Sequence, residues 1–493
     1  MQAADPKLVI AGGGVAGLAL ALAAGRQGLQ VEVVERDPAP TADSPEAAFA
    51  AARRGAPQVH QSHGFLARLT LVLRERFPDL LDALMEAGAK PLPIVRDPSV
   101  LRDGEEDLSI LALRRTTLEW VLRRAVNAEP GVTVRNEAAV AGVVAEPGDR
   151  VPHVTGLRLD TGEVLPADIV AACTGRRGDV PRWLHEVGVE VPEEEHDTRF
   201  VYLTRWYRQL DPAAFAEMPP RLGADLGYLK YLAVPCDGDT FSITLAVRGK
   251  DSELRSALSD PDRFEATCRR LPGPAELFEL GPLEALGPVL PMGGLVNRIR
   301  RFVDGDGAPL VTGFHALGDA HTCTNPLYGR GCALAFVQAT LLADAIAAHP
   351  GDPDARSRAY EAASQREVEP WYHAAVQMDA YRPPKPDGDG DGGNGSDGDG
   401  GRNGDGAGSD DGDAASSAPR EKTLTEVFAQ ILAEGETDPV IGRALARLFN
   451  LLMLPEELMT DTEFLARVAP IVARPMPATP VVPPGPTRDE VLA

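Results

Sequence analysis

Short apolar runs alternate with helical patterns over the first 180 residues. Apolar residues recur at helical spacing over 18–25 and 115–126, and the small side chains of the first segment predict a buried helix. Strand-length apolar runs occupy residues 8–11, 31–34, 131–145, 151–160 and 168–173. Strands that alternate with helices in this way are typical of a parallel sheet. We therefore expect an α/β fold that begins with a Rossmann-like βαβ unit.

The pattern changes in the middle of the chain. Polar and apolar residues alternate over 198–207, and two further strand-like runs, 228–234 and 240–247, flank the turn sequence Cys236–Asp239. Two strands joined by such a turn predict a β-hairpin, and hence an antiparallel sheet. We expect a discontinuous FAD-type α/β domain over residues 1–180 and 290–380, with an antiparallel substrate domain, 181–289, inserted into it. A linker, 384–418, and a helical extension, 420–493, follow.

The predicted linker consists mainly of Asp, Gly, Asn and Ser. A segment without large apolar residues cannot offset its ordering entropy by burial, so we expect it to be disordered. Its sequence from Asp387 to Gly392 begins like an EF-hand calcium loop. The twelfth position is Gly398, however, where that loop requires Glu, which favours a solvated linker.

Three helix-start signals follow the linker. Thr423 and Glu426 form a capping box, Asp438-Pro439 begins a second helix, and Thr460 with Glu463 begins a third. We expect these helices to form a cap docked on the main body. A lid over a substrate pocket and a dimer contact are the alternatives, and the oligomeric state stays open.

Charge and cysteine content narrow the class of protein. A net charge of −24 opposes binding to nucleic acid or to an anionic membrane surface. The five cysteines are odd in number and form no CxxC pair, which favours reduced thiols, a cytoplasmic location and no metal site. We expect neither a signal peptide nor a transmembrane segment, because the longest apolar stretch, 331–346, contains Gln338, Thr340 and Asp344.

The first strand leads directly into a glycine motif. Gly12, Gly14 and Gly17 form GxGxxG between strand and helix. Gly12 permits a tight turn, Gly14 lets the backbone approach a pyrophosphate, and Gly17 lets the helix pack closely on the sheet. The helix N-terminus offers free N–H groups to phosphates, and Glu35, after the second strand, can bind ribose hydroxyls, with Arg36 beside it as a further contact. The motif predicts a dinucleotide site.

A second glycine-bearing segment, residues 316–335, reads ALGDAHTCTNPLYGRGCALA. We expect a strand over 309–312 and 316–317 that ends at Asp319, whose carboxylate can accept hydrogen bonds from sugar hydroxyls. A glycine-rich loop then begins a long apolar helix, so backbone N–H groups again face a polar or anionic ligand. Gly329 and Gly331 would let the chain lie against a flat ring.

Together the two motifs resemble the FAD-dependent monooxygenases of the aromatic-hydroxylase superfamily, which also includes squalene-type epoxidases and geranylgeranyl-reductase-like enzymes. The resemblance covers almost the whole chain and implies FAD as the cofactor. It implies that Asp319 contacts the ribityl chain or pyrophosphate, and that Pro326, Gly329 and Gly331 border the isoalloxazine. Arg115, in RxxLxxxL, is similar to the FAD-contacting arginine of that group.

One motif departs from the family pattern. Where the aromatic hydroxylases have DGxxSxVR, this chain has TGRRGDVPR at 174–182. Because that motif serves FAD and NADPH in the family, the electrons could come from transiently docked NAD(P)H or from a partner flavin reductase. The halogenase signature WxWxIP is absent from the sequence.

The resemblance favours a monooxygenase that hydroxylates or epoxidises a mostly apolar small molecule with O2, through a flavin hydroperoxide. The alternatives are an FAD-dependent reductase or dehydrogenase and a noncatalytic redox sensor. Four side chains are candidates for catalysis. His321 could donate a proton, His63 could line the flavin, and Arg330 could balance charge on the reduced ring. Cys323 could be reactive. Each of the four also has an ordinary alternative: helix capping for His321, packing for His63, a salt bridge for Arg330 and an inert buried thiol for Cys323.

Overall fold

The computed structural model describes residues 6–95, 97–103, 105, 108–211, 213, 223–380, 424–474 and 485–493. The predicted linker and the predicted helix cap at Thr423 lie outside the described residues.

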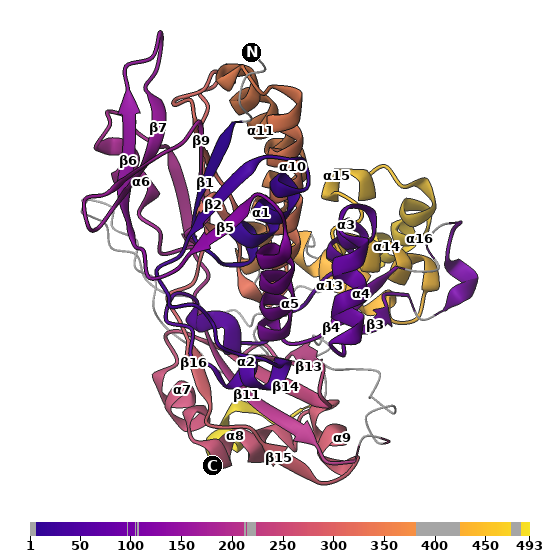
Figure 1. Cartoon of the computed structure of the whole chain (residues 1–493). Coiled ribbons are helices and arrows are strands. Elements are labelled where there is room, and N and C mark those ends of the chain that lie inside the picture. Colours follow the sequence, from indigo (N-terminus) through magenta and orange to yellow (C-terminus); the bar gives the residue numbers. More distant parts are fainter. Residues whose placement is uncertain are drawn as a thin grey trace, which may run out of the picture.

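A five-stranded parallel sheet forms the centre of the first domain, as the α/β pattern predicts (Figure 1). Its order is β18-β9-β1-β2-β5, with bounds Phe314–Ala316, Ile169–Ala172, Lys7–Ala11, Gln30–Val34 and Val132–Arg135. All neighbours pair in parallel. Three helices cover one face, namely α1 (Val15–Gly25), α5 (Arg115–Ala128) and α10 (Gly331–Ala348). Their apolar side chains and those of the sheet form one core.

An antiparallel sheet covers the other face of the parallel sheet. It contains β6 (Val140–Glu146), β7 (His153–Leu159) and β8 (Val164–Pro166). The sequence pattern predicts one strand over 131–145, but the structure has two strands in different sheets. Glu137 has φ 57°, which breaks the extended chain between β5 and β6. α6 (Val180–His185) packs on β6.

The predicted hairpin is present and belongs to a second antiparallel sheet, β12-β13-β14-β11-β15, to which β16 is added along β11. The bounds are Gly223–Asp225, Leu229–Pro235, Thr240–Arg248, Phe200–Gln209, Leu283–Ala285 and Leu290–Met292. Its far face packs against α7 (Ser252–Ser259), α8 (Pro261–Cys268), α9 (Pro274–Glu279) and α17 (Arg488–Leu492).

Shorter elements connect these sheets. A three-stranded sheet contains β10 (Glu193–Asp197), β17 (Val296–Arg300) and β19 (Thr322–Cys323), and the hairpin β3–β4 spans Lys90–Pro93 and Ser109–Ala112. The remaining helices of this part are α2, α3, α4, α11 and α12, over Pro45–Ala50, Ala67–Arg76, Pro78–Glu86, Pro353–Glu367 and Glu369–Ala380. Within the described residues, only α10 is long and apolar enough to cross a membrane. Most of α10 is buried inside the protein, so it is a core helix.

The C-terminal helices pack beside α3 and α4 (Figure 1). They are α13 (Leu424–Glu434), α14 (Pro439–Phe449), α15 (Pro455–Leu458) and α16 (Thr462–Ala473). Asp438 caps α14 as predicted, whereas α16 is capped by Asp461 and not by Thr460, whose hydroxyl donates to the Glu457 carbonyl.

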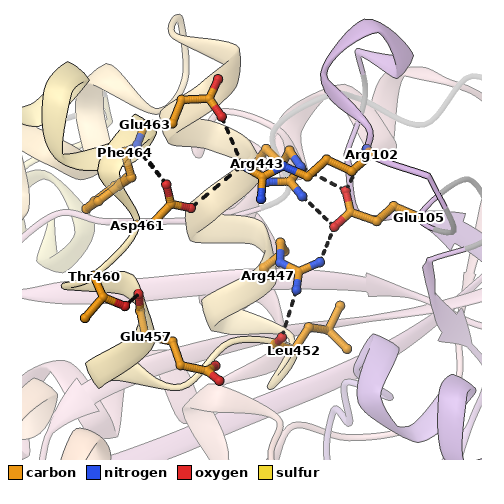
Figure 2. Close-up of polar contacts among 10 residues, drawn as sticks. All are labelled: Arg102, Glu105, Arg443, Arg447, Leu452, Glu457, Thr460, Asp461, Glu463 and Phe464. Carbon is orange, nitrogen blue, oxygen red and sulfur yellow. Dashed lines mark hydrogen bonds and ion pairs between the residues drawn. The ribbon is translucent and has the colours of Figure 1, made fainter.

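An ion-pair cluster fixes this bundle to the main body. Figure 2 shows Glu105 between Arg443 and Arg447 of α14. Asn450 also accepts a hydrogen bond from the backbone N–H of Ala67 at the start of α3. These contacts and the shared apolar core describe a docked cap.

Candidate functional site

The glycine motif has the backbone geometry of a tight strand-to-helix turn. Gly12 has φ +108°, and a side chain there would place Cβ 2.5 Å from the Cys173 carbonyl oxygen. A Cβ on Gly17 would collide with the Gly12 carbonyl, so α1 can approach the turn only with glycine at this position. Gly14, the N-cap of α1, has no atom within 4 Å of its would-be Cβ. The backbone at Gly14 is therefore open to a ligand.

Glu35 closes the turn from the end of β2. Its Oε2 accepts a hydrogen bond from the Gly13 N–H at 2.7 Å, and its Oε1 accepts one from the Asp37 N–H at 2.9 Å. Arg123 of α5 donates to the Gly13 carbonyl at 2.8 Å. The carboxylate is buried but lies on the wall of a cavity, where its remaining lone pairs can accept further hydrogen bonds.

The second motif follows β18. Gly318 has φ +58°, and its N–H donates to Gln338 of α10 at 2.8 Å, which orients the 3-10 turn carrying Asp319. Burial raises the pKa of the Asp319 carboxyl despite the nearby charges of Arg115, Arg176 and Arg298. Asp319 lies near the N-terminus of α10, since a Cβ on Gly331 would be 4.0 Å from its Oδ1.

The two motifs line one cavity of about 370 Å³. All ten residues expected to bind the cofactor, except Gly17, contribute to its wall. They are Gly12, Gly14, Glu35, Arg36, Arg115, Asp319, Pro326, Gly329 and Gly331. Gly17 lies behind the wall, where it permits the packing of α1 on the turn. The cavity thus extends from the end of β2 to the start of α10.

A charged network on α5 reaches into this cavity. Arg115 donates to Glu119 at 2.9 Å and to Nε2 of His63 at 3.1 Å. Glu119 also accepts from Arg53 at 2.7 Å. Burial, and secondly the positive charge of Arg115, lower the pKa of His63 to about 3. The imidazole is therefore neutral, and its Nδ1–H donates to the Gln61 carbonyl at 2.9 Å.

The segment around His63 also contacts the antiparallel sheet. Ser62 shares hydrogen bonds with Ser242 and Thr244 of β14, at 2.7 and 2.6 Å. Gln61 accepts a hydrogen bond from Thr204 of β11 at 2.7 Å. The hydroxyl-bearing face of this sheet is thus held against the cavity wall. Sequence reasoning missed these residues because single Ser and Thr residues in strands carry no local signal.

The polar groups of two expected catalytic residues, His321 and Arg330, are bonded to protein groups. His321 packs against Phe302 and Tyr360, and its ring nitrogens contact Thr322 and Glu361. Among the described residues, His321 is not part of the cavity wall, so the geometry gives it no role as a proton donor to a bound ring.

Arg330 lies on the wall, but its guanidinium donates to the Trp371 carbonyl at 3.0 Å and stacks on the Tyr328 ring. Arg115 also brings a positive charge to the cavity wall, where its guanidinium contacts His63 and Glu119. Cys323 also lines the cavity, and burial raises the pKa of its thiol, which keeps the sulfur protonated.

No family model and no curated protein match this chain. Solved structures do resemble it. PqsL, a probable FAD-dependent monooxygenase from Pseudomonas aeruginosa, is 21% identical, with 76% of this chain and 94% of that chain aligned at a TM-score of 0.54. The p-nitrophenol 4-monooxygenase PnpA from Pseudomonas putida DLL-E4 is 19% identical, with 77% and 89% aligned at a TM-score of 0.55.

The Diels-Alderase PyrE3 of pyrroindomycin biosynthesis is 16% identical, with 91% of this chain and 82% of that chain aligned at a TM-score of 0.57. At these identities the likeness concerns the arrangement of the elements. The chain has a parallel sheet with a βαβ start and an inserted antiparallel sheet. This architecture agrees with the structural likeness to PqsL and PnpA. This chain has the fold of the FAD-dependent monooxygenases.

Proposed function

We propose that this protein is an FAD-dependent monooxygenase that transfers one oxygen atom from O2 to a mostly apolar small molecule. The observation that carries the proposal is that both glycine motifs, far apart in the sequence, line the same cavity. The fold shared with PqsL and PnpA supports it.

The residues of the cavity fit FAD. The open backbone at Gly14 and the N–H groups at the start of α1 can bind a pyrophosphate. Glu35 can accept ribose hydroxyls at one end. Asp319, for which the described residues supply no hydrogen-bond donor, can accept hydroxyls of a ribityl chain. Pro326, Gly329 and Gly331 would border the flavin ring.

The other residues of the wall suggest where the substrate binds. Met292, Leu295 and Val296 form an apolar part of the wall, which excludes water and suits an apolar substrate. Arg115 holds a positive charge at the cavity and is fixed by Glu119 and His63. FAD, when bound, supplies electron transfer and oxygen activation.

The overall reaction balances with NAD(P)H as the two-electron donor. One oxygen atom enters the product, the other leaves as water, one proton is taken up from solvent, and NAD(P)+ is formed. A partner flavin reductase that delivers the same two electrons would serve equally.

The test is the reactivity of the purified full-length protein loaded with FAD. The bound flavin is reduced anaerobically with NADPH, NADH or dithionite, and its reoxidation by O2 is then followed with candidate apolar substrates. We expect substrate-dependent consumption of O2 and an oxygenated product. Substrate reduction without O2 would instead support a reductase, and the absence of catalytic electron transfer to any acceptor would support a redox sensor.

A further inference from the structure

Asn325 begins the loop that lines the cavity, and its polar groups are bonded to three other parts of the chain. Its N–H donates to Asn297 of β17 at 2.7 Å. Its Oδ1 accepts from the Leu327 N–H at 3.0 Å and from the hydroxyl of Tyr202, a residue of β11. Its Nδ2 donates to Asp379 of α12 at 2.7 Å. The Asn325 side chain is completely buried, so each of these bonds replaces a lost bond to water.

Asp379 is the acceptor at the centre of this arrangement. Besides Asn325, its carboxylate accepts hydrogen bonds from Nδ2 of Asn297 and from the hydroxyl of Tyr328, both at 2.7 Å. These three donors are neutral, and no salt bridge within 4 Å joins Asp379 to a cation among the described residues. Its negative charge therefore acts on the loop through hydrogen bonds to neutral groups, which are stronger than neutral pairs, and through its electrostatic effect on the buried guanidinium of Arg330.

Two of these donors belong to the loop itself. Asn325 and Tyr328 flank the dipeptide Pro326-Leu327, and the same loop continues through Gly329, which has φ +65°, to the start of α10. The packing of Leu327 on an apolar cluster and the bond from Arg330 to the Trp371 carbonyl hold parts of this loop. Asp379 and Asn297 add polar fixed points from outside the loop, at Asn325 and Tyr328.

Tyr202 extends the arrangement to the antiparallel sheet. It packs in an apolar cluster with Phe200, Ala246 and Leu295, against which Met292 and Leu327 also pack. Leu295 and Met292 line the cavity as well. The hydroxyl of Tyr202 therefore forms a polar link between the proposed substrate region and the loop that borders the proposed flavin site.

We propose that Asp379 is a positioning residue that sets the 325–331 loop against the flavin ring through Asn325 and Tyr328, and that Tyr202 couples this loop to the substrate sheet. The proposal rests on the proposed function in so far as the loop faces FAD. It assigns a role to the end of α12, which none of the sequence motifs includes.

The experiment compares full-length variants loaded with FAD. Asp379→Asn keeps the size of the side chain but removes one acceptor oxygen and the charge, and Tyr202→Phe removes only the hydroxyl. Tyr231→Phe is the matched control, because Tyr231 lies on the opposite face of the same sheet and donates to the Pro272 carbonyl. Asp251→Asn controls for the loss of a carboxylate, since Asp251 pairs with Arg488 and is not part of the cavity wall.

We expect Asp379→Asn to weaken FAD binding about tenfold, and Tyr202→Phe about threefold. Asp379→Asn should also change the visible spectrum of the bound flavin and make its midpoint potential more positive, because a negative charge is removed. The double variant should lose less than the product of the single losses, because both residues act through Asn325. Both controls should stay within about twofold of the wild type.

Wild-type affinity, spectrum and potential in Asp379→Asn would overturn the proposal. If that variant does not fold, Tyr328→Phe, which removes one of the three donors, takes its place. It should weaken FAD binding less than tenfold and still change the flavin spectrum. Wild-type FAD affinity and spectrum in Tyr328→Phe would overturn the proposal equally. If the wild-type protein takes up no FAD, the proposed function fails separately. The hydrogen-bond network is then tested by thermal unfolding of the apoprotein. Strictly additive losses of unfolding free energy in Tyr202→Phe and Asp379→Asn would overturn the network too.

Discussion

Nη1 of Arg115 lies 3.1 Å from Nε2 of His63, and the guanidinium donates to the imidazole. The opposite ring nitrogen donates to the Gln61 carbonyl at 2.9 Å, so both nitrogens are occupied. Burial and the charge of Arg115 lower the pKa of His63 to about 3. His63 thus orients Arg115 at the cavity and stays neutral near neutral pH.

We predict that His63 does not ionise between pH 5 and 8 in the folded protein, which NMR titration of the histidines measures. The unfolded chain, with a histidine pKa of about 6.5, binds this proton, so His63 reduces stability as the pH falls below that value. His63→Gln, which can still accept from Arg115, should keep most of the FAD affinity, whereas His63→Phe should lose about tenfold. A group that titrates near pH 6.5 in the wild type and disappears in both variants would contradict this account.

The two motif glycines Gly14 and Gly17 should respond differently to the same substitution. Gly17→Ala places a methyl group into the Gly12 carbonyl, and we expect a loss of about 1–3 kcal/mol or more in the free energy of unfolding. Gly14→Ala meets no protein atom within 4 Å, so it should fold normally but bind FAD on the order of tenfold more weakly. Denaturant unfolding and FAD titration separate the two effects. Equal FAD affinity in Gly14→Ala and wild type would show that the cofactor does not approach this backbone.

Docking of the C-terminal helices should depend on Glu105. Burial alone would raise the pKa of Glu105. Hydrogen bonds from the Arg443 side chain and the Arg102 N–H, together with the positive charges of Arg443 and Arg447, outweigh burial and lower this pKa. Its contribution to stability is therefore complete above the unfolded-state pKa of about 4.3 and is lost as the pH falls through the lower folded-state value.

Glu105→Gln should cost about 2 kcal/mol of unfolding free energy near neutral pH. Glu463→Gln, which alters the exposed pair with Arg102, should cost about 0–1 kcal/mol. Limited proteolysis of the C-terminal helices, compared between pH 7 and pH 3, measures the docking directly. Undiminished protection in Glu105→Gln at both pH values would exclude this ion pair as the anchor.

The turn of the β13–β14 hairpin should be anchored by one buried ion pair to Arg114, the N-cap residue of α5. Asp237 accepts from Arg114 at 2.6 Å, and both side chains are 1% exposed. Asp237→Ala leaves Arg114 buried without this partner, so we expect a loss of about 3–5 kcal/mol. Asp239→Ala, in the same turn but paired with Lys90 at the surface, should cost about 0–1 kcal/mol. Urea unfolding of the two variants gives the comparison, and similar losses would contradict the assigned anchor.

The features predicted correctly are local in the sequence. The βαβ start and the hairpin follow from apolar periodicity and turn residues within a few tens of positions. The break at Glu137 does not, because Arg135-Asn136-Glu137 contains no Gly or Pro to mark the place where the backbone changes direction. The first turn of α16 was ambiguous for a similar reason, since Thr460 and Asp461 are both good caps and only the helix geometry selects Asp461.

The polar partners of the site depend on distant segments. His321 follows the GDA sequence, a position that predicts a side chain near the flavin ring. The 3-10 turn instead directs the imidazole toward Tyr360 and Glu361 of α11. Asp379 is bonded to a loop more than fifty positions earlier in the chain. A single sequence has no periodicity or spacing that connects such pairs, so only the folded structure identifies them.

The flavin assignment requires that one cavity, lined by Gly14 of the first glycine motif and Gly331 of the second, holds FAD. The most direct measurement is titration of FAD into the purified full-length protein, followed by the visible absorption and fluorescence of the flavin. We predict stoichiometric binding with a changed flavin spectrum, weakened by Gly14→Ala and by Asp319→Ala. A protein that is colourless when purified and leaves the spectrum of added FAD unchanged would contradict the account.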